Sequence, residues 1–530
     1  MLVLFAALPI IVLCFLIIVL NWSVNKAILV ALSLLLAAII FIWQTPLLQI
    51  LASGIQGTFF ALEIVLIIFG AIFFLNILQQ SGLETKIKDI FKELSRDKRI
   101  LAIIIGLVFS TLIEGSAGFG APAVLLAPIL IILGFSPVAA VTVVLIGAAV
   151  SSIFGAFGLP IVFGFGAGLG AFVQEPEFLN QVTISIAYFN LISFWLACLA
   201  MIVVLIFSFG QKTVRHFKYV LEVIPYLTMA CLFVVLPGIL LAKFLGPELV
   251  SVGGGLIGLI LLLLATKQGW LIPKNEWSFD GIVPKISSAS VSSKKIFSSL
   301  LPYFLIVFIV FLSRADFLPF KNWLMNFGRL YFPFLDIGYS FSPFYSIGVL
   351  LILVSLFFFF TSKMHLSQLK TSCQNSLSKI KKPLLTLVLV LIFVKVFVYA
   401  SGENPNQYLS MPLILARAMA DFAGPSWPVF APFIGALGSF ITGGTTISNL
   451  LFSEFQVSTA LFLRIDPVLV LSLQGLGAAL GNMIAIHNVV VALAVVGALE
   501  QTNKVIRNNL QVVFIISLIL GILGFCLTLL

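Results

Sequence analysis

The chain has 530 residues, of which 61% are hydrophobic and only 9% are charged. Soluble globular proteins carry about 25% charged residues, so most of this chain must face lipid or the protein interior. Its composition excludes a soluble enzyme, a nucleic-acid-binding protein and a disordered scaffold. An integral membrane protein is the class that fits.

The apolar runs, taken in chain order, predict an all-helical polytopic membrane protein. Runs near the length of a membrane span occur at 3–20, 25–43, 59–80, 184–208, 219–242, 249–265, 296–313, 344–361, 383–400 and 511–530. Two longer stretches, 136–172 and 466–499, are interrupted by glycine, proline and polar residues, and each is expected to cross once as a broken helix. Since a span needs about 20 apolar residues, we expect about 12 transmembrane helices.

Two further regions differ from these runs because their apolar arms are too short to span a bilayer. In 100–134 the arms 101–113 and 123–133 flank a glycine-rich tip, and in 429–463 two arms flank a tip of Gly, Thr, Ser and Asn. Short arms around an irregular tip are typical of re-entrant hairpins. Ser151-Ser152 and Gly481-Asn482 are the expected break points of the two broken helices, and they are expected to face the tips.

The basic residues predict the orientation of the chain. Most of the 29 Lys and Arg residues lie in short stretches between the apolar runs, and cytoplasmic loops hold the excess of such residues. This pattern is consistent with both termini outside, a first hairpin that enters from the cytoplasm and a second that enters from outside. The stretch 84–99 is expected to form an amphipathic helix on the cytoplasmic surface.

Similarity between the two halves predicts an inverted repeat within one membrane domain, 1–530. Pro137-Val138 and Gly147-Ala148-Ala149 recur at the same spacing as Pro467-Val468 and Gly477-Ala478-Ala479. Inverted repeats with broken helices are how many secondary transporters are built. The expected parts are a first repeat at 25–208, connecting helices at 219–313 with a cytoplasmic loop at 266–295, and a second repeat at 344–530.

No motif indicates a nucleotide, a metal or another cofactor. The chain has no Gly-Lys-Ser/Thr phosphate loop and no H-E-x-x-H pattern, and it contains only three histidines. An ion-gradient-driven carrier therefore fits better than a membrane-embedded enzyme. The expected partners are the lipid bilayer, a small-molecule substrate and a coupling ion, with no nucleic acid.

The two tips are the candidate substrate site. Glycine lets the backbone leave helical geometry, and free N–H groups there can point at an anion. Hydroxyl and amide side chains can bind a carboxylate or a hydroxyl without adding fixed charge. The expected substrate-binding residues are Gly115, Ser116, Gly118, Gly120, Thr445, Thr446, Ser448, Asn449 and Asn482. Such residues also permit close helix packing, but two tips at matching places favour binding.

Ionisable groups at membrane depth are functional candidates, because inserting each at mid-helix costs roughly 2.5–3.5 kcal/mol. Glu114 lies at the first tip and His487 follows Asn482, and either could carry a coupled proton. The structural alternatives are a glutamate that caps the tip amides and a histidine bonded to a backbone carbonyl. Lys395 could offset the charge of an anion, or extend its amine to the outer interface.

Several blocks carry a resemblance to a known family. Residues 114–122 read E-G-S-A-G-F-G-A-P, which is similar to the E-G-[AS]-A-G-F-G-[AT]-P motif of the L-lactate permease family, and 427–428, 431–440 and 481–488 resemble it too. The resemblance covers nearly the whole chain. It implies proton-coupled uptake of lactate, often with glycolate, and kinship with a superfamily whose hairpin tips meet around an anion. One departure is Thr445, a hydroxyl where the family usually has an amide, which could shift the choice among hydroxy acids.

These observations predict a secondary transporter of the bacterial inner membrane that carries a small 2-hydroxy monocarboxylate with protons. A sodium-coupled carrier of di- or tricarboxylates is ranked second, because a dianion would be expected to face two cations and only Lys395 and Arg417 are available. From other classes, a membrane-embedded transferase and an ungated channel remain as alternatives. The sequence leaves open lactate against glycolate, the proton stoichiometry and the oligomeric state.

Overall fold

The computed structural model describes residues 1–18, 20, 22–82, 95–118, 120–169, 176–280, 293–314, 318–332, 339–362, 364–400 and 405–529. Within these ranges the chain is helical apart from loops and one antiparallel ladder, β1 (Leu330–Phe332) with β2 (Tyr339–Phe341). Parts of several predicted features lie outside the described residues: residue 19 of the run 3–20, positions 84–94 of the amphipathic helix, Phe119 of the first tip, 170–172 of the first broken helix, 281–292 of the cytoplasmic loop and Leu530 of the last run.

The all-helical polytopic prediction is confirmed. In the described residues, nine helices are long and apolar enough to cross a membrane: Val24–Trp43, Leu47–Gln80, Lys98–Ala117, Pro137–Gly168, Glu177–Phe209, Phe217–Leu245, Pro247–Lys267, Pro467–Val495 and Leu499–Leu527. Shorter apolar helices cover Leu2–Ile17, Ala121–Ile132, Leu300–Arg314, Ile347–Thr361 and Leu384–Val398. Each predicted crossing falls on one of these helices.

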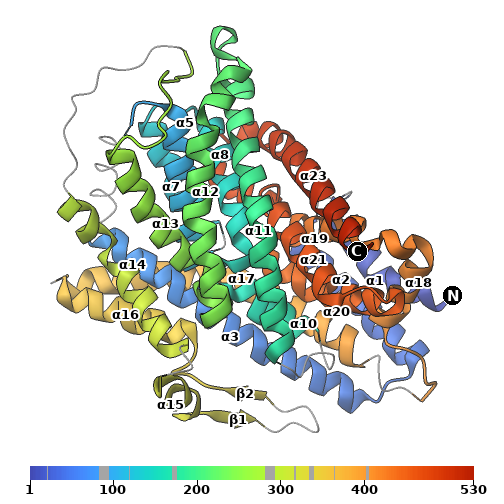
Figure 1. The fold of residues 1–530 in the computed structure, drawn as a ribbon. Helices are drawn as coiled ribbons and strands as arrows, with labels where there is room; N and C mark the ends of the chain where they lie inside the picture. The colour runs from blue at the N-terminus through green and yellow to red at the C-terminus, as the bar shows by residue number, and fades with distance from the viewer. Residues whose placement is uncertain are drawn as a thin grey trace.

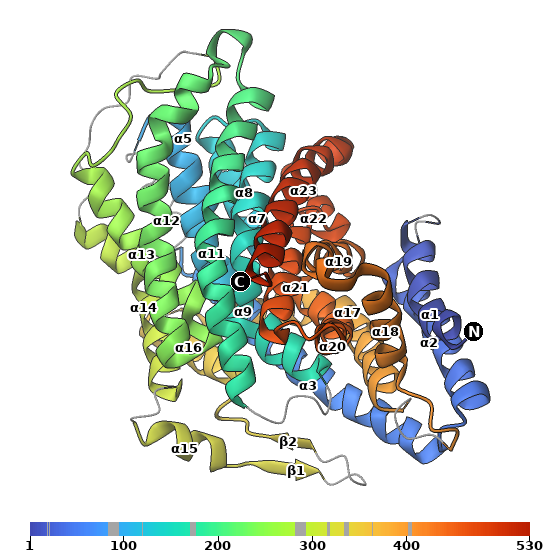
Figure 2. The same ribbon diagram turned by 45° about the vertical axis from the view of Figure 1, so that its right-hand side comes forward.

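Several long helices pack together along one side of the molecule, and we call this group the belt. In Figure 1, α3 (Leu47–Gln80) runs across the lower part of the view, and α17 (Leu366–Lys395) and α16 (Ile347–Thr361) pack against it. The helices approach closely at glycine, because a Cβ added at Gly70 would lie 2.4 Å from the Gly348 carbonyl oxygen. At the N-terminal edge, α1 (Leu2–Ile18) packs on α2 (Val24–Ala38), as Figure 2 shows.

Both long belt helices begin earlier than predicted. The expected spans 59–80 and 383–400 are the ends of helices that start at Leu47 and Leu366. The polar stretch after Leu366 stays helical because buried contacts hold it: the Asn76 amide donates to Ser376 Oγ (2.8 Å), and that hydroxyl donates to the Ser372 carbonyl (2.7 Å). The basic residues after 366 therefore lie on a helix rather than in a loop.

The first hairpin pairs the helix Lys98–Ala117 with α7 (Ala121–Ile132). The Lys98–Ala117 helix consists of α5 (Lys98–Leu101), the π-helical η2 (Ala102–Phe109) and α6 (Ser110–Ala117). The prediction of a short first arm, 101–113, is wrong, because Asp97 caps the helix and α6 continues to Ala117. The Lys98 amine donates to the Leu133 carbonyl, so the two ends of the hairpin lie together.

The second hairpin joins α19 (Trp427–Thr442) to α20 (Thr445–Leu463) through Gly443-Gly444. Its open end is fixed by the Trp427 indole, which donates to Gln456 Oε1 (2.9 Å). Residues 445–449 form the first turns of α20 rather than an irregular tip. That both hairpins are re-entrant stays a prediction.

The two broken helices pack against the first arms of the hairpins. The first comprises α8 (Pro137–Ser151), η3 (Ser152–Phe154), α9 (Gly155–Leu159), η4 (Pro160–Phe165) and α10 (Gly166–Gly168), and the second comprises α21 (Pro467–Gly481) and α22 (Ile486–Val495). A Cβ added at Gly147 would lie 1.7 Å from the Gly106 carbonyl oxygen, and one at Gly477 would lie 1.9 Å from that of Pro432. The repeated Gly-Ala-Ala blocks thus occupy comparable packing positions, although the inverted repeat itself stays a prediction.

The remaining elements surround these units. They are α11 (Pro176–Val204), η6 (Leu205–Phe209), η7 (Lys212–Val214), α12 (Phe217–Leu245), η8 (Pro247–Leu249), α13 (Val250–Lys267), α14 (Ser293–Arg314), α15 (Phe320–Asn326), α18 (Met411–Ala423), η10 (Gly424–Ser426), η11 (Leu499–Gln501) and α23 (Thr502–Leu527). Among them, α13 packs on α6, α11 packs on α21, and α18 packs on α20.

Candidate functional site

The first break lies against both hairpin tips. Ser152 Oγ, directly after α8, is 2.9 Å from Thr445 Oγ1 at the start of α20, so one hydroxyl donates to the other. On the first tip, a Cβ added at Gly118 would lie 3.0 Å from the Ala156 Cβ in α9. Segments that are hundreds of residues apart in the chain therefore meet at this break.

The second break lies between the same two tips. A Cβ added at Gly120 would lie 3.2 Å from Asn488 Oδ1 in α22. One added at Gly443 would lie 3.6 Å from the His487 Cβ. We call the meeting place of Gly118, Gly120 and the segments 152–158, 443–449 and 482–488 the junction.

The backbone of the junction is strained. Ala156, Phe157 and Gly158 have φ angles of 44°, 57° and 73°, and a left-handed conformation costs a residue with a side chain roughly 1–2 kcal/mol. Buried non-glycine residues keep such angles only where the surrounding structure holds them, and these residues cluster at functional sites. The tight approach of Gly118 to Ala156 is part of that support.

Two helix N-termini open into the junction. In the described residues, the first backbone hydrogen bond into α20 is from Ser448 N to Gly444 O (3.2 Å), and the first into α22 is from Val489 N to Ala485 O (3.1 Å). The N–H groups that precede them in each first turn have no intrahelical acceptor. Helix N-termini carry a partial positive charge and favour anions. The junction therefore presents peptide N–H groups that can donate hydrogen bonds to an anion.

Several predicted substrate-binding side chains are already hydrogen-bonded. Ser116 Oγ donates to the Ile113 carbonyl (3.1 Å). Ser448 Oγ donates to the Gly435 carbonyl (2.8 Å) and accepts from the Gln474 amide (3.3 Å). These two serines hold the hairpins in shape and retain little capacity for a ligand.

Other predicted side chains keep polar atoms available. The Asn449 amide donates to the Pro160 carbonyl (3.1 Å), but its buried Oδ1 has no hydrogen-bond partner among the described residues. Thr446 is buried beside the Gly444 turn. Asn482 Oδ1 accepts from the Asn488 amide (2.7 Å), which ties the second break together.

The three glycines of the first tip differ in their surroundings. Gly115 lies within α6, where an added Cβ would meet Val252 N of α13 at 2.4 Å, so this glycine serves close helix packing. The Gly118 amide donates to the Glu114 carbonyl (2.9 Å). The expectation of free amides at these two positions is wrong, because Gly115 lies inside α6 and the Gly118 amide closes the last turn of that helix. Gly120 remains at the turn.

The two proton candidates lie on different sides of the junction. Glu114 is 2% exposed, its Oε1 faces Gly155, and its Oε2 has no hydrogen-bond partner in the described part of the chain. His487 is exposed on the first turn of α22. Glu114 is therefore a buried acid beside the first break, whereas His487 lines the second tip.

Lys395 lies away from the tips. Its amine donates to the Ala167 carbonyl (2.7 Å) and lies 4.6 Å from the centre of the Phe60 ring. The side chain is only 2% exposed, so its amine is enclosed by the protein. It interacts electrostatically with Glu454 of α20, a buried acid that was not among the predicted site residues.

Two residues of the junction were missing from the predicted site. Ser152 was expected only as a break point, and it contacts the second tip. Asn488 ends the block 481–488, and it bridges the second break to the first tip. In both cases a polar residue within an apolar stretch was the available signal.

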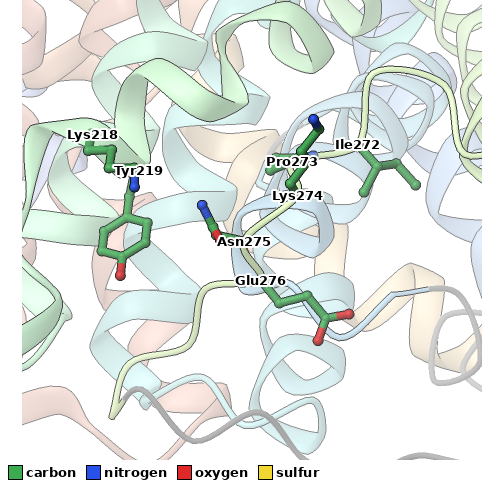
Figure 3. A pocket seen from close by; sticks show the side chains of 7 residues that line it. All are labelled: Lys218, Tyr219, Ile272, Pro273, Lys274, Asn275 and Glu276. Atoms are coloured by element: carbon green, nitrogen blue, oxygen red, sulfur yellow. The ribbon is translucent and has the colours of Figure 1, made fainter.

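A cavity of about 640 Å³ lies elsewhere in the molecule. Figure 3 shows Lys218 and Tyr219 on one side of it and the loop of Ile272–Glu276 on the other. None of the predicted site residues lines it, so it is not the site described above.

Comparison with known proteins identifies the family. The family model for L-lactate permease matches residues 2–338 and 333–530. A Haemophilus influenzae protein provisionally named L-lactate permease is 28% identical, over 90% of this chain and 89% of its own. The L-lactate permease of Escherichia coli K12 is 26% identical, over 98% and 94% of the two chains. The glycolate permease GlcA of the same strain is 26% identical, over 95% and 91%.

These relatives are bacterial permeases, and they align with this chain over almost its entire length. Together with the membrane-spanning helices, the alignment identifies a multi-pass transporter, not an enzyme, in a bacterial inner membrane. The chain belongs to the L-lactate permease family.

Proposed function

We propose that this transporter takes up lactate, or a related small 2-hydroxy monocarboxylate such as glycolate, together with protons. The observation that carries the proposal is the meeting of the N-termini of α20 and α22 at the junction. Peptide N–H groups, hydroxyls and amides gathered there suit one small monoanion. The relatives named for lactate and for glycolate support the same substrate class.

In the proposed binding mode, the substrate carboxylate accepts hydrogen bonds from the N–H groups of Gly444–Ile447 and from the hydroxyl of Thr446. The 2-hydroxyl contacts Asn449 or Asn482. The unpartnered Asn449 Oδ1 supports this choice, because a buried acceptor without a donor is costly and a ligand hydroxyl would satisfy it. Ser116 and Ser448 shape the site through their bonds to the hairpin backbones.

The coupled proton is proposed to bind Glu114 or His487. A neutral carboxyl is far less costly to bury than a carboxylate, and Glu114 Oε2 has no described partner to compensate a charge. A proton and a monoanion that cross together carry no net charge. Alternating access then moves the two hairpin-bearing units, each a hairpin with the broken helix packed on it, relative to the remaining helices.

Uptake by the purified protein in proteoliposomes tests this function. We expect saturable accumulation of labelled L-lactate under an imposed pH gradient, and no accumulation under a sodium gradient of equal size. Competition by unlabelled L-lactate, D-lactate, glycolate and pyruvate then ranks the substrates. Accumulation driven by sodium, or competition by citrate or succinate alone, would instead support the sodium-coupled di- or tricarboxylate carrier.

A further inference from the structure

A buried acid and a buried amine lie outside the junction and have no role in the proposed binding mode. Glu454 on α20 is 5% exposed and Lys395 on α17 is 2% exposed. Each charge costs free energy in the interior, and a pair is stable there only if its members compensate one another. The helices α17 and α20 are in contact, which brings the two side chains near enough to interact electrostatically.

The pair lies where three segments meet. The Lys395 amine donates to the Ala167 carbonyl in α10, at the far end of the first broken helix. A Cβ added at the next residue, Gly168, would lie 2.3 Å from Ser453 Oγ, so α10 is in close contact with α20 beside Glu454. A change at the first break can therefore reach the pair through α10.

The pair also connects two larger units of the fold. Lys395 belongs to the belt, because α17 packs along α3 and α2. Glu454 belongs to the second hairpin, because α20 packs against α19 and α21. If the hairpins move relative to the belt, the separation between Glu454 and Lys395 changes.

Buried polar atoms without hydrogen-bond partners lie on α20 between the junction and the Glu454–Lys395 pair. Asn449 Oδ1, Ser453 Oγ and Glu454 Oε2 are buried on α20 and have no hydrogen-bond partner among the residues described. They lie along about 8 Å of helix, from Asn449 toward the C-terminal end of α20. Buried polar atoms without partners are costly, so such a row is expected to be retained for binding a proton or water.

We propose that Glu454, with Lys395 as its counter-charge, is a further proton-binding site, besides Glu114 or His487 at the junction, and that the coupled proton must pass through it for transport to follow the pH gradient. This inference rests on the proposed proton-coupled function. While the ammonium is near, the carboxylate is compensated. When the hairpin and the belt separate, Glu454 Oε2 takes a proton from the outer solution, and it releases that proton to the cytoplasmic solution when the two side chains approach again. No other bond changes.

Few other charges act on Glu454. Among the elements packed against α20, the helices α19, α21, η4 and α10 contain no charged residue. On α18, Arg417 and Asp421 are both exposed. Lys395 therefore determines whether Glu454 can remain ionised.

The test compares two modes of transport by proteoliposomes. Exchange of internal for external L-lactate at equal pH needs substrate binding and movement but no net proton transfer, whereas accumulation under a pH gradient needs both. We expect Glu454→Gln to exchange at close to the wild-type rate and to accumulate no more than empty liposomes. Glu454→Asp should recover part of the accumulation.

Two further variants separate coupling from stability. The double variant Glu454→Gln with Lys395→Gln leaves no buried charge at this pair, so it should fold and exchange but not accumulate. Asp421→Asn removes an exposed acid from neighbouring α18 and should behave as wild type. Accumulation by Glu454→Gln equal to wild type would overturn the inference, and so would an equal loss of exchange and accumulation in both Glu454 variants. If the wild-type protein exchanges L-lactate but does not accumulate it under a pH gradient, the proposed function is overturned as well.

Discussion

Thr445 connects the second hairpin to the first broken helix through one hydroxyl. Its Oγ1 lies 2.9 Å from Ser152 Oγ, and both side chains are buried. A bond between segments so distant in sequence holds the two halves of the molecule in one arrangement. Because the N–H groups of the same turn are proposed to donate hydrogen bonds to the substrate carboxylate, this contact helps to hold those N–H groups in the position that binding needs.

Replacing Thr445 by Val keeps the shape of the side chain and removes its hydroxyl. We expect the change to lower stability by about 1 kcal/mol, the value of one hydrogen bond, and to raise the KM for uptake. Thr459→Val is the matched control, because this buried hydroxyl on the same helix donates to the Phe455 carbonyl of its own helix (2.7 Å). Thermal unfolding in detergent and uptake kinetics check both. A KM change of equal size in the two variants would contradict the assignment.

Gly443 is a position where the backbone requires glycine. Its φ is +83°, and an added Cβ would lie 3.6 Å from the His487 Cβ. Gly443→Ala should lower stability by roughly 1–2 kcal/mol, the cost of a left-handed residue with a side chain, and should also reduce uptake. Gly497→Ala carries the same backbone cost in open space, with φ +67°. Its unfolding temperature should fall similarly while uptake per folded molecule stays unchanged.

At the scale of elements, the sequence predicts where helices occur better than where they end. Apolar length locates every crossing, and glycine with polar residues locates both breaks, because these signals are local. The start of the first hairpin arm is not local: Arg99 is buried by Asp97 and by the carbonyls of Tyr219 and Asn275, which come from distant segments. Because the sequence does not reveal those partners, Lys98 and Arg99 were predicted to lie in a loop.

The free amides of the first tip were mispredicted for the same reason. Glycine clusters indicate either an irregular turn or close packing, and the sequence alone does not distinguish them. At Gly115 the outcome depends on α13, whose backbone would collide with a Cβ there. At Gly443-Gly444 no helix packs so closely, and the chain turns.

The packing of each hairpin arm on a broken helix gives a prediction for the two Gly-Ala-Ala blocks. Gly147→Ala and Gly477→Ala each force a methyl group into a backbone carbonyl at under 2 Å, so we expect a loss of at least about 1–3 kcal/mol. Gly54→Ala is the control, because its Cβ would meet only Ile392 Cγ2 at 3.9 Å. Unfolding temperature and yield of folded protein measure the effect. Full tolerance at Gly147 or Gly477 would show that the helices do not approach this closely.

At the scale of the whole molecule, a hydrogen bond joins the two arms of each hairpin at the end away from its tip, and both tips lie at the junction. The Lys98 amine bonds the Leu133 carbonyl at the end of the first, and Trp427 bonds Gln456 at the end of the second. If the hairpins enter from opposite sides, as the basic residues predict, the junction lies between two wedges. Movement of either wedge then opens the site to one side only.

Single cysteines on a background without the native ones test this topology in whole cells. Arg96 and Ser136 flank the first hairpin, and Ser426 and Arg464 flank the second. We expect a membrane-impermeant maleimide to label Ser426→Cys and Arg464→Cys in intact cells, and Arg96→Cys and Ser136→Cys only after permeabilisation. The helix Lys98–Ala117 is long enough to cross a membrane. If it crosses, Arg96→Cys and Ser136→Cys lie on the same side only when α7, of 12 residues, crosses back. Since 12 helical residues span about 18 Å, that return is too short for a hydrocarbon core of about 30 Å, and labelling of both positions from the cytoplasm would therefore support re-entrance.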